Sequence, residues 1–263
     1  MSALIHPTAI IDPKAQLGVN VSVGAFSMVH AGSILHDGVT LHSHVVIEGG
    51  TEIGNNTEIY PFAVLGKAPQ HVKYAGEPST LVIGARNIIR EHVTMHRGTE
   101  VGNMTTVIGD DGFFMVGSHV AHDCIVGNNA IFANGVGVGG HVEIGNFVTM
   151  GGFSAVHQFV RIGDFAMVGG KATVLRDVIP YGIVSGEQAF LNGLNLVGLK
   201  RRGFDKAALS ELRETYKQLF EGEGTFDQRL HILSEQTNTD TVQKLVDFIR
   251  TGNARNLCQP ELR

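Results

Sequence analysis

An apolar residue recurs at every sixth position over most of this chain. One run extends from Ile5 to Leu65 and another from Ile108 to Val174, and a small or β-branched side chain stands two residues before nearly every member. A period of six fits neither the 3.6 of a helix nor the simple alternation of an amphipathic strand. It is typical of a parallel β-helix, in which each hexad forms one short strand and one turn and about eighteen residues complete a coil. We therefore expect a mainly β protein, a left-handed parallel β-helix of hexapeptide repeats.

The composition agrees with a narrow prism. The chain of 263 residues has 34 glycines without a Gly-X-Y period, few aromatic residues and no tryptophan. A net charge of −5 argues against nucleic-acid and membrane-surface partners. The two cysteines form no disulfide framework, no run is long enough to span a membrane, and the first residues lack the features of a secretion signal. We expect a cytoplasmic protein with no integral membrane segment.

Two interruptions break the repeat. Residues 67–80 contain two prolines and no apolar repeat, which predicts a loop that projects from a coil. Long loops on rigid scaffolds are usually functional. A shorter interruption lies near residues 100–105.

The pattern changes after Pro180. Residues 181–199 read as irregular, and helical periodicity begins after Asp205, a plausible N-cap. Helices are expected up to Gly222, at 226–234 and at about 239–250. The expected division is a β-helix over 1–186 and a C-terminal helical region over 187–263.

Histidines are the main candidates for chemistry. Four of the thirteen lie in early turns and read as solvated: His30, His36, His42 and His44. His122 differs, because Asp123 follows it and a carboxylate can hold one imidazole nitrogen as a donor while the other takes a proton. Neighbours on a strand point to opposite faces, so contact between these two requires a turn or bulge. Gly140, one coil later, offers an N–H that an oxyanion could approach without a Cβ in the way.

Coil stacking predicts a column of polar groups on one side of the prism. His122 precedes Gly140 and His141 by about one coil, and His157 lies about one coil further on. His96 lies earlier and could flank the column. From the residues alone, a catalytic and a structural role for His122 are equally open.

Five segments resemble the UDP-N-acetylglucosamine acyltransferases, which begin lipid A synthesis. They are His96–Thr99, His119–Cys124, Gly139–Val142, Val156–Phe159 and Leu199–Phe204. The likeness covers essentially the whole chain, including the loop at 67–80 and the helical tail. It implies a homotrimer with no metal and no cofactor, with sites in the clefts between subunits. Four apolar positions expected to face outward agree with subunit contact: Phe113, Met115, Phe153 and Phe159.

The resemblance implies a role for each matching position. His122 would deprotonate the sugar 3-hydroxyl for attack on the thioester of an acyl-acyl carrier protein, Asp123 would orient it, and the Gly140 amide would stabilise the oxyanion. Gly170, without a side chain, would admit a long β-hydroxyacyl group. The positions implied to bind UDP-N-acetylglucosamine are Lys73, His71, His96, His119, His141 and His157, with Gln158, Asn195 and Arg201 at the nucleotide end. Lys200–Arg202, Arg161 and Lys171 would meet the acidic carrier protein.

Two positions depart from the family pattern. His71 stands in the loop where the family commonly has Asp near the acceptor's 3-position. A 3-amino sugar analogue, and thus N-acylation, stays open as an alternative. Val197 stands where a Glu commonly follows the nucleotide-site Asn, so one contact to the nucleoside is expected to be lost.

Rival functions fit less of the chain. A zinc hydratase of the γ-carbonic anhydrase type could take its ligands from His119, His122 and His141. That class lacks the long loop and the tail. The N-acyltransferase of the same pathway normally has a preceding uridine-binding domain, for which hexads that begin by Ile5 leave no room. Coenzyme A acetyltransferases and a purely structural prism also remain as alternatives.

Overall fold

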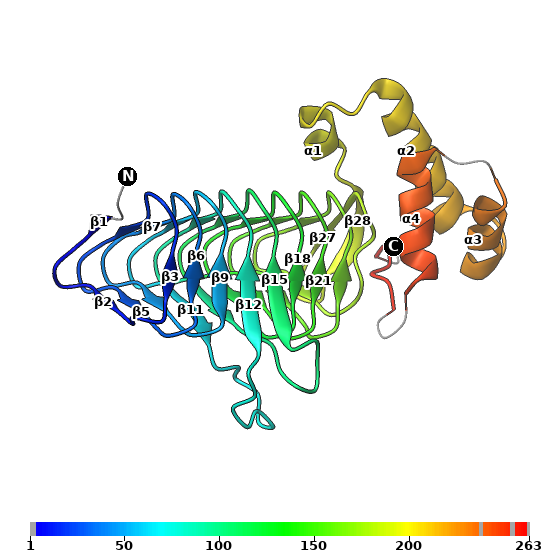
Figure 1. Cartoon of the computed structure of the whole chain (residues 1–263). Helices are drawn as coiled ribbons and strands as arrows, with labels where there is room; N and C mark the ends of the chain where they lie inside the picture. Colours follow the sequence, from blue (N-terminus) through cyan, green and yellow to red (C-terminus); the bar gives the residue numbers. More distant parts are fainter. Residues whose placement is uncertain (1–3, 237–238, 253–255, 262–263) are drawn as a thin grey trace.

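Figure 1 shows the computed structural model of the chain, which describes residues 4–236, 239–252 and 256–261. Three sheets form the sides of a prism, and successive short strands pass from one sheet to the next. Strands one coil apart pair in parallel, as Ile5 does with Val23 and His119 with Gly137. The expected left-handed parallel β-helix with about eighteen residues per coil is therefore confirmed.

The strands fall into three sets. The eleven-stranded sheet contains β1 (Leu4–Ile5), β4 (Ser22–Val23), β7 (Thr40–Leu41), β10 (Glu58–Ile59), β13 (Ile88–Ile89), β16 (Phe113–Phe114), β19 (Ile131–Phe132), β22 (Thr149–Met150), β25 (Met167–Val168), β27 (Gly182–Ser185) and β28 (Phe190–Leu194). The nine-stranded sheet contains β2 (Ile10–Ile11), β5 (Met28–Val29), β8 (Val46–Ile47), β11 (Val64–Lys67), β14 (Thr94–His96), β17 (His119–Val120), β20 (Gly137–Val138), β23 (Ala155–Val156) and β26 (Thr173–Val174). The eight-stranded sheet contains β3 (Gln16–Leu17), β6 (Ile34–Leu35), β9 (Thr51–Ile53), β12 (Thr80–Ile83), β15 (Thr105–Ile108), β18 (Ile125–Val126), β21 (Glu143–Ile144) and β24 (Arg161–Ile162).

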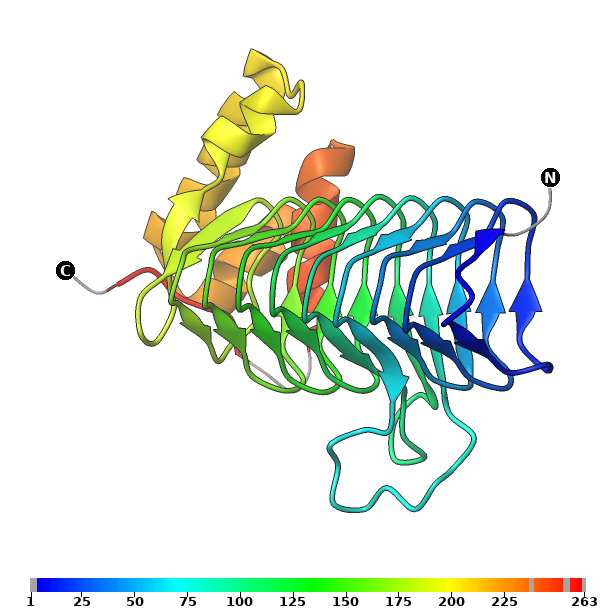
Figure 2. The same ribbon diagram turned by 90° about the vertical axis from the view of Figure 1, so that its left-hand side faces the viewer.

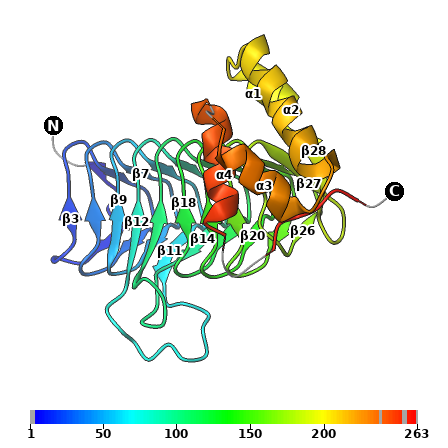
Figure 3. The same ribbon diagram turned by 90° about the vertical axis from the view of Figure 1, so that its right-hand side faces the viewer.

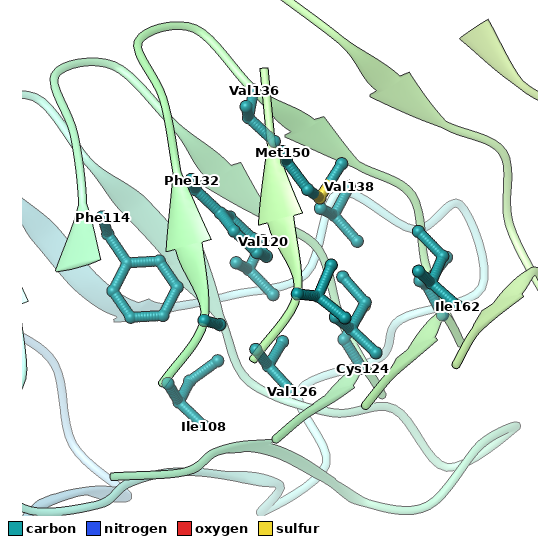
Figure 4. Packing of buried hydrophobic residues seen from close by; sticks show 14 of the residues in the cluster. Ile108, Phe114, Val120, Cys124, Val126, Phe132, Val136, Val138, Met150 and Ile162 are labelled. Atoms are coloured by element: carbon teal, nitrogen blue, oxygen red, sulfur yellow. The ribbon is translucent and has the colours of Figure 1, made fainter. Parts of the chain in front are cut away.

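The apolar residue of each hexad fills the interior. Val120, Val126 and Phe132 are at most 1% exposed and lie in the packed column that Figure 4 shows. The small residue two places earlier, such as Cys124, is buried as well. The first coil is the exception, because no coil covers its outer side and Ile5 keeps 37% of its surface exposed.

Both interruptions leave the prism at the same corner, where the nine-stranded sheet turns into the eight-stranded one. Residues 68–79 join β11 to β12, and residues 97–104 join β14 to β15. Figure 2 shows the two loops projecting together from one side of the prism. They are tied together, because the Glu100 N–H donates to Glu77 Oε1 at 3.1 Å and the Arg97 guanidinium lies 5.6 Å from the Tyr74 ring centroid. The two loops thus extend side by side from the prism.

The expectation of an irregular segment after Pro180 is wrong. Strand β27 extends the eleven-stranded sheet beside β25, and β28 pairs with β27 in the antiparallel direction. The short helix α1 (Leu196–Arg201) follows. These strands form because the sheet offers an unpaired edge there, which a hexad pattern does not reveal. The division at residue 186/187 stays a prediction.

The helical region has the three expected helices. They are α2 (Lys206–Glu221), α3 (Phe226–Ser234) and α4 (Asp240–Arg250). The Asp205 side chain accepts from the Ala208 N–H, and Gly222 ends α2, as expected. Figure 3 shows α4 in front of the later coils, and α3 packs against α2 and α4. Among the described helices, none has the length and apolarity that crossing a membrane requires.

Arg161 fastens the helical region to the prism. Its Nε donates to Asp177 Oδ2 at 2.8 Å, its Nη2 donates to the Phe248 carbonyl at 3.0 Å, and the guanidinium lies 4.3 Å from the Phe248 ring centroid. Asp177 is 1% exposed. Arg161 is therefore engaged inside the fold, and its expected contact with a carrier protein stays a prediction.

We predict that Arg161→Ala destabilises the protein by about 3–5 kcal/mol, because it leaves the Asp177 carboxylate buried without its cation. Urea unfolding followed by circular dichroism measures the loss. Arg86→Ala is the matched control, since Arg86 pairs with Asp110 and Asp111 while 52% exposed, and exposed pairs contribute about 1 kcal/mol or less. Equal stability of the two variants would contradict the role given to Arg161.

Candidate active site

His122 and Asp123 form a turn at the corner from which both loops project. The turn joins β17 to β18, and Asp123 has a φ of 59°, in the left-handed region. This backbone folds the two neighbouring side chains toward each other, so that His122 Nδ1 lies 2.8 Å from Asp123 Oδ2. The contact that the sequence left open is therefore made, and by a turn.

Four donors surround the Asp123 carboxylate. The residue as a whole is 1% exposed. Oδ1 accepts from the Thr99 N–H at 3.0 Å and the Asn103 N–H at 2.8 Å, and Oδ2 accepts from the Thr99 hydroxyl at 2.6 Å and from His122. Burial alone would raise the pKa of Asp123, but these hydrogen bonds outweigh it and the pKa is lowered. An ionised carboxylate only accepts, so His122 Nδ1 carries the proton that faces it and Nε2 presents its lone pair outward.

Gly140 lies directly beside the His122 ring. A Cβ built on Gly140 would be 2.6 Å from His122 Cε1 and 2.8 Å from Nε2. The next residue, His141, donates its N–H to the His122 carbonyl at 3.0 Å, which keeps the two coils in register. Only glycine leaves the backbone at position 140 open beside the ring nitrogen.

His122 lies between two further imidazoles. The His141 ring meets it edge-on with centroids 5.0 Å apart and stacks on Phe159 at 4.5 Å. Burial lowers the pKa of His141, although the nearby Asp123 carboxylate acts in the opposite direction. His71 comes from the loop at 68–79 and also meets the His122 ring edge-on at 5.0 Å. Its Nδ1 accepts from the Lys73 N–H at 3.3 Å, which places both loop residues at this corner.

His119 and His96 form a second pair of rings on the nine-stranded sheet. Their centroids are 4.8 Å apart, and His119 Nδ1 lies 2.7 Å from Thr94 Oγ1. His96 is 5% exposed, and burial followed by the charges of His119 and His122 lowers its pKa to about 4. His96 is thus neutral at physiological pH, and it presents a polar but uncharged side chain beside His119.

Of the five remaining predicted residues, two lie at the corner of His122 and three lie elsewhere in the chain. His157 and Gln158 follow β23 at the corner of His122, with Val156 in register with Val138. Gly170 lies between β25 and β26, at another corner. Asn195 caps α1 and donates to the Phe165 carbonyl at 3.0 Å, next to the third corner, and Arg201 is exposed at the end of that helix. A single chain does not bring all the predicted residues together.

The zinc hypothesis fits this corner poorly. In the described part of the chain, the cluster whose possible ligand atoms converge within 4.8 Å is His122, Asp123 and His141, not the three histidines that the hypothesis uses. The Asp123 oxygens already accept four hydrogen bonds. A metal at this carboxylate would have to displace one of these donors.

Comparison with known proteins gives consistent matches. Residues 177–258 match the family described as UDP-N-acetylglucosamine O-acyltransferase, domain 2, and residues 32–67 match the bacterial transferase hexapeptide family. The chain is 54% identical over 209 residues to an acyl-[acyl-carrier-protein]–UDP-N-acetylglucosamine O-acyltransferase of Caulobacter vibrioides, covering 79% of this chain and 80% of that protein.

Solved structures match over almost the full length. A UDP-N-acetylglucosamine O-acyltransferase from Moraxella catarrhalis is 42% identical with a TM-score of 0.94, covering 97% of this chain and 99% of that one. The structure of LpxA from Acinetobacter baumannii is 42% identical with a TM-score of 0.93, with the same coverage.

Proposed function

Because this chain belongs to the family of acyl-[acyl-carrier-protein]–UDP-N-acetylglucosamine O-acyltransferases, we propose that it transfers a β-hydroxyacyl group from acyl-acyl carrier protein to the 3-position of UDP-N-acetylglucosamine, the reaction that begins lipid A synthesis. It is an acyltransferase built on hexapeptide repeats. The observation that supports this chemistry most directly is the contact of His122 with the buried Asp123, beside the bare backbone of Gly140.

In the proposed reaction, His122 Nε2 removes the proton of the sugar 3-hydroxyl while that oxygen attacks the thioester carbonyl. The charge that develops on the carbonyl oxygen is stabilised by the Gly140 N–H. When the tetrahedral intermediate collapses, the C–S bond breaks and the carrier thiolate takes the proton from the imidazolium. Asp123 keeps the imidazolium oriented throughout and stays ionised.

The acceptor and the donor need residues from three corners. We place His71, Lys73, His96, His119, His141, His157 and Gln158 around the sugar and diphosphate. Gly170, Asn195 and Arg201 lie at other corners, so they complete the site only when corners of different chains meet. A homotrimer meets this requirement, and Phe153, 69% exposed, and Phe159, 44% exposed, supply outward apolar surface for its contacts.

We also propose that the acyl carrier protein binds a basic segment and that the protein is located in the cytoplasm. Lys200–Arg202 is an exposed basic segment except where Arg202 covers the Phe147 ring, and it suits an acidic carrier protein. The cytoplasmic location rests on the two unpaired cysteines, Cys124 and Cys258.

The atom at the acceptor's 3-position that receives the acyl group is either a hydroxyl oxygen or an amine nitrogen. His71 lies against the His122 ring. An imidazole can accept a hydrogen bond from a hydroxyl or from an uncharged amine, so the 3-amino analogue is a second candidate acceptor.

A side-by-side assay tests the proposal. Purified protein is given a long β-hydroxyacyl carrier protein with either UDP-N-acetylglucosamine or its 3-amino analogue, and acylated product is quantified by mass spectrometry. We expect product with the hydroxyl acceptor. Product from the amine alone would replace O-acylation by N-acylation. A folded protein that acylates neither would overturn the proposed function.

A further inference from the structure

Thr99 binds the Asp123 carboxylate through two groups. Its hydroxyl donates to Oδ2 at 2.6 Å and its N–H to Oδ1 at 3.0 Å, and the residue is 1% exposed. Short O–H···O⁻ hydrogen bonds of this kind are about twice as strong as those between neutral groups. Besides His122, Thr99 gives the carboxylate its only side-chain hydrogen bond among the described residues.

We propose that Thr99 is a positioning residue for the proton transfer: its two donors fix the Asp123 carboxylate in the orientation that holds His122 in the tautomer with a protonated Nδ1. The kinetic part of this inference rests on the proposed function. The tautomer of His122 is a property of the protein alone and is independent of any substrate.

The loop around Thr99 is built to hold that orientation. The Thr99 carbonyl accepts from the N–H groups of Gly102 and Met104, both at 3.1 Å, which closes residues 99–104 into a tight turn. A Cβ on Gly102 would lie 2.3–2.5 Å from the carboxylate atoms of Asp123. The carboxylate is therefore enclosed on the side of this loop by Gly102 and held there by the Thr99 donors.

Thr106 also forms a hydrogen bond with Asp123, but with its backbone and not with its carboxylate. Its hydroxyl accepts from the Asp123 N–H at 2.8 Å, which stabilises the turn but does not touch the carboxylate. No Lys or Arg forms a salt bridge with Asp123 within the described residues; its ionic neighbours are His122 and His141. Without the hydroxyl of Thr99, Oδ2 would keep one donor and could turn away from Nδ1.

The kinetic test compares Thr99→Val with Thr99→Ser in the acyl-transfer assay. For Thr99→Val we expect kcat to fall by roughly 10- to 100-fold, the range known for the hydrogen-bond partners that orient metal-ligating histidines, with KM nearly unchanged. Thr99→Ser keeps the hydroxyl and restores most of kcat. Thr57→Val is the matched control, because the buried Thr57 hydroxyl donates to the Gly84 carbonyl and accepts from the Asn87 N–H, away from the site. We expect it to leave kcat unchanged.

The spectroscopic test needs no substrate. In protein labelled with ¹⁵N-histidine, the His122 resonances, assigned by their loss in His122→Ala, report which ring nitrogen carries the proton. We expect the Nδ1–H form in the parent protein and in Thr99→Ser, and a mixture of tautomers in Thr99→Val. If the parent protein has this form but transfers no acyl group, the proposed function fails and the role of Thr99 in fixing the tautomer stands.

An unchanged tautomer together with an unchanged kcat in Thr99→Val would overturn the inference. If that variant does not fold, Gly102→Ala takes its place, because the added Cβ must displace the same carboxylate. We expect the same loss of kcat and of the single tautomer. A Gly102→Ala protein with parental kcat and tautomer would overturn the inference equally.

Discussion

Replacing His122 by alanine lowers kcat by roughly 10²- to 10⁴-fold, the range expected when a general base is removed. The fold should tolerate the change, because Asp123 keeps three hydrogen bonds, two from Thr99 and one from the Asn103 N–H. The carboxylate is therefore not left unpaired. Single-turnover transfer from the acyl carrier protein measures the chemical step without interference from product release.

His36→Ala is the control for the loss of an imidazole. His36 pairs with Glu52 at 2.7 Å on the outer face of the prism, with its side chain 43% exposed. The His36→Ala variant should transfer the acyl group at the same rate as the parent protein. If His122→Ala turned over as fast as His36→Ala, His122 could not be the base.

Gly140→Ala should lower kcat by roughly 10²-fold, the loss expected when a reacting group is displaced by about 1 Å. The backbone of Gly140 does not require a positive φ, so the effect comes from the added methyl group. That group would lie 2.6–3.1 Å from three atoms of the His122 ring, and it would push the ring away from the Gly140 N–H. Steady-state acyl transfer measures the change in kcat, and thermal unfolding in parallel measures the change in stability.

A double mutant separates the clash from any general damage to the coil. In the His122→Ala background the ring is absent, so Gly140→Ala should no longer destabilise the protein. The difference between the two thermal shifts gives the coupling between positions 122 and 140. Equal shifts in both backgrounds would mean that the methyl group meets something other than His122.

The periodicity of the sequence was enough to predict the coils, because one inward residue per hexad fixes both the strand and its register. It also brought His122 and Gly140 together, since they are eighteen residues apart with no insertion between them. Thr99 and Asn103 could not be found in this way. They are 24 and 20 residues from Asp123, in a loop that the coil period does not describe.

Two further differences have physical causes. The hairpin of β27 and β28 forms on an edge that only the folded sheet provides. Asn195 was expected to bind nucleotide, and its side chain also accepts from the Gly198 N–H and donates to Phe165, two contacts that begin α1. The resemblance to the family identified Asn195. The structure shows that the same side chain also caps α1.

The antiparallel strand β28 has a consequence for how the stack of coils ends. A stack of parallel coils has no intrinsic length, and its last coil exposes a row of N–H and C=O groups on which a coil of another molecule could be added. In the eleven-stranded sheet, β28 reverses the chain direction after β27, and Leu191 then forms a bridge to Pro260. In this sheet a further parallel coil would meet a strand running in the opposite direction with the C-terminal segment beside it, so the hairpin ends the repeat on this face of the prism.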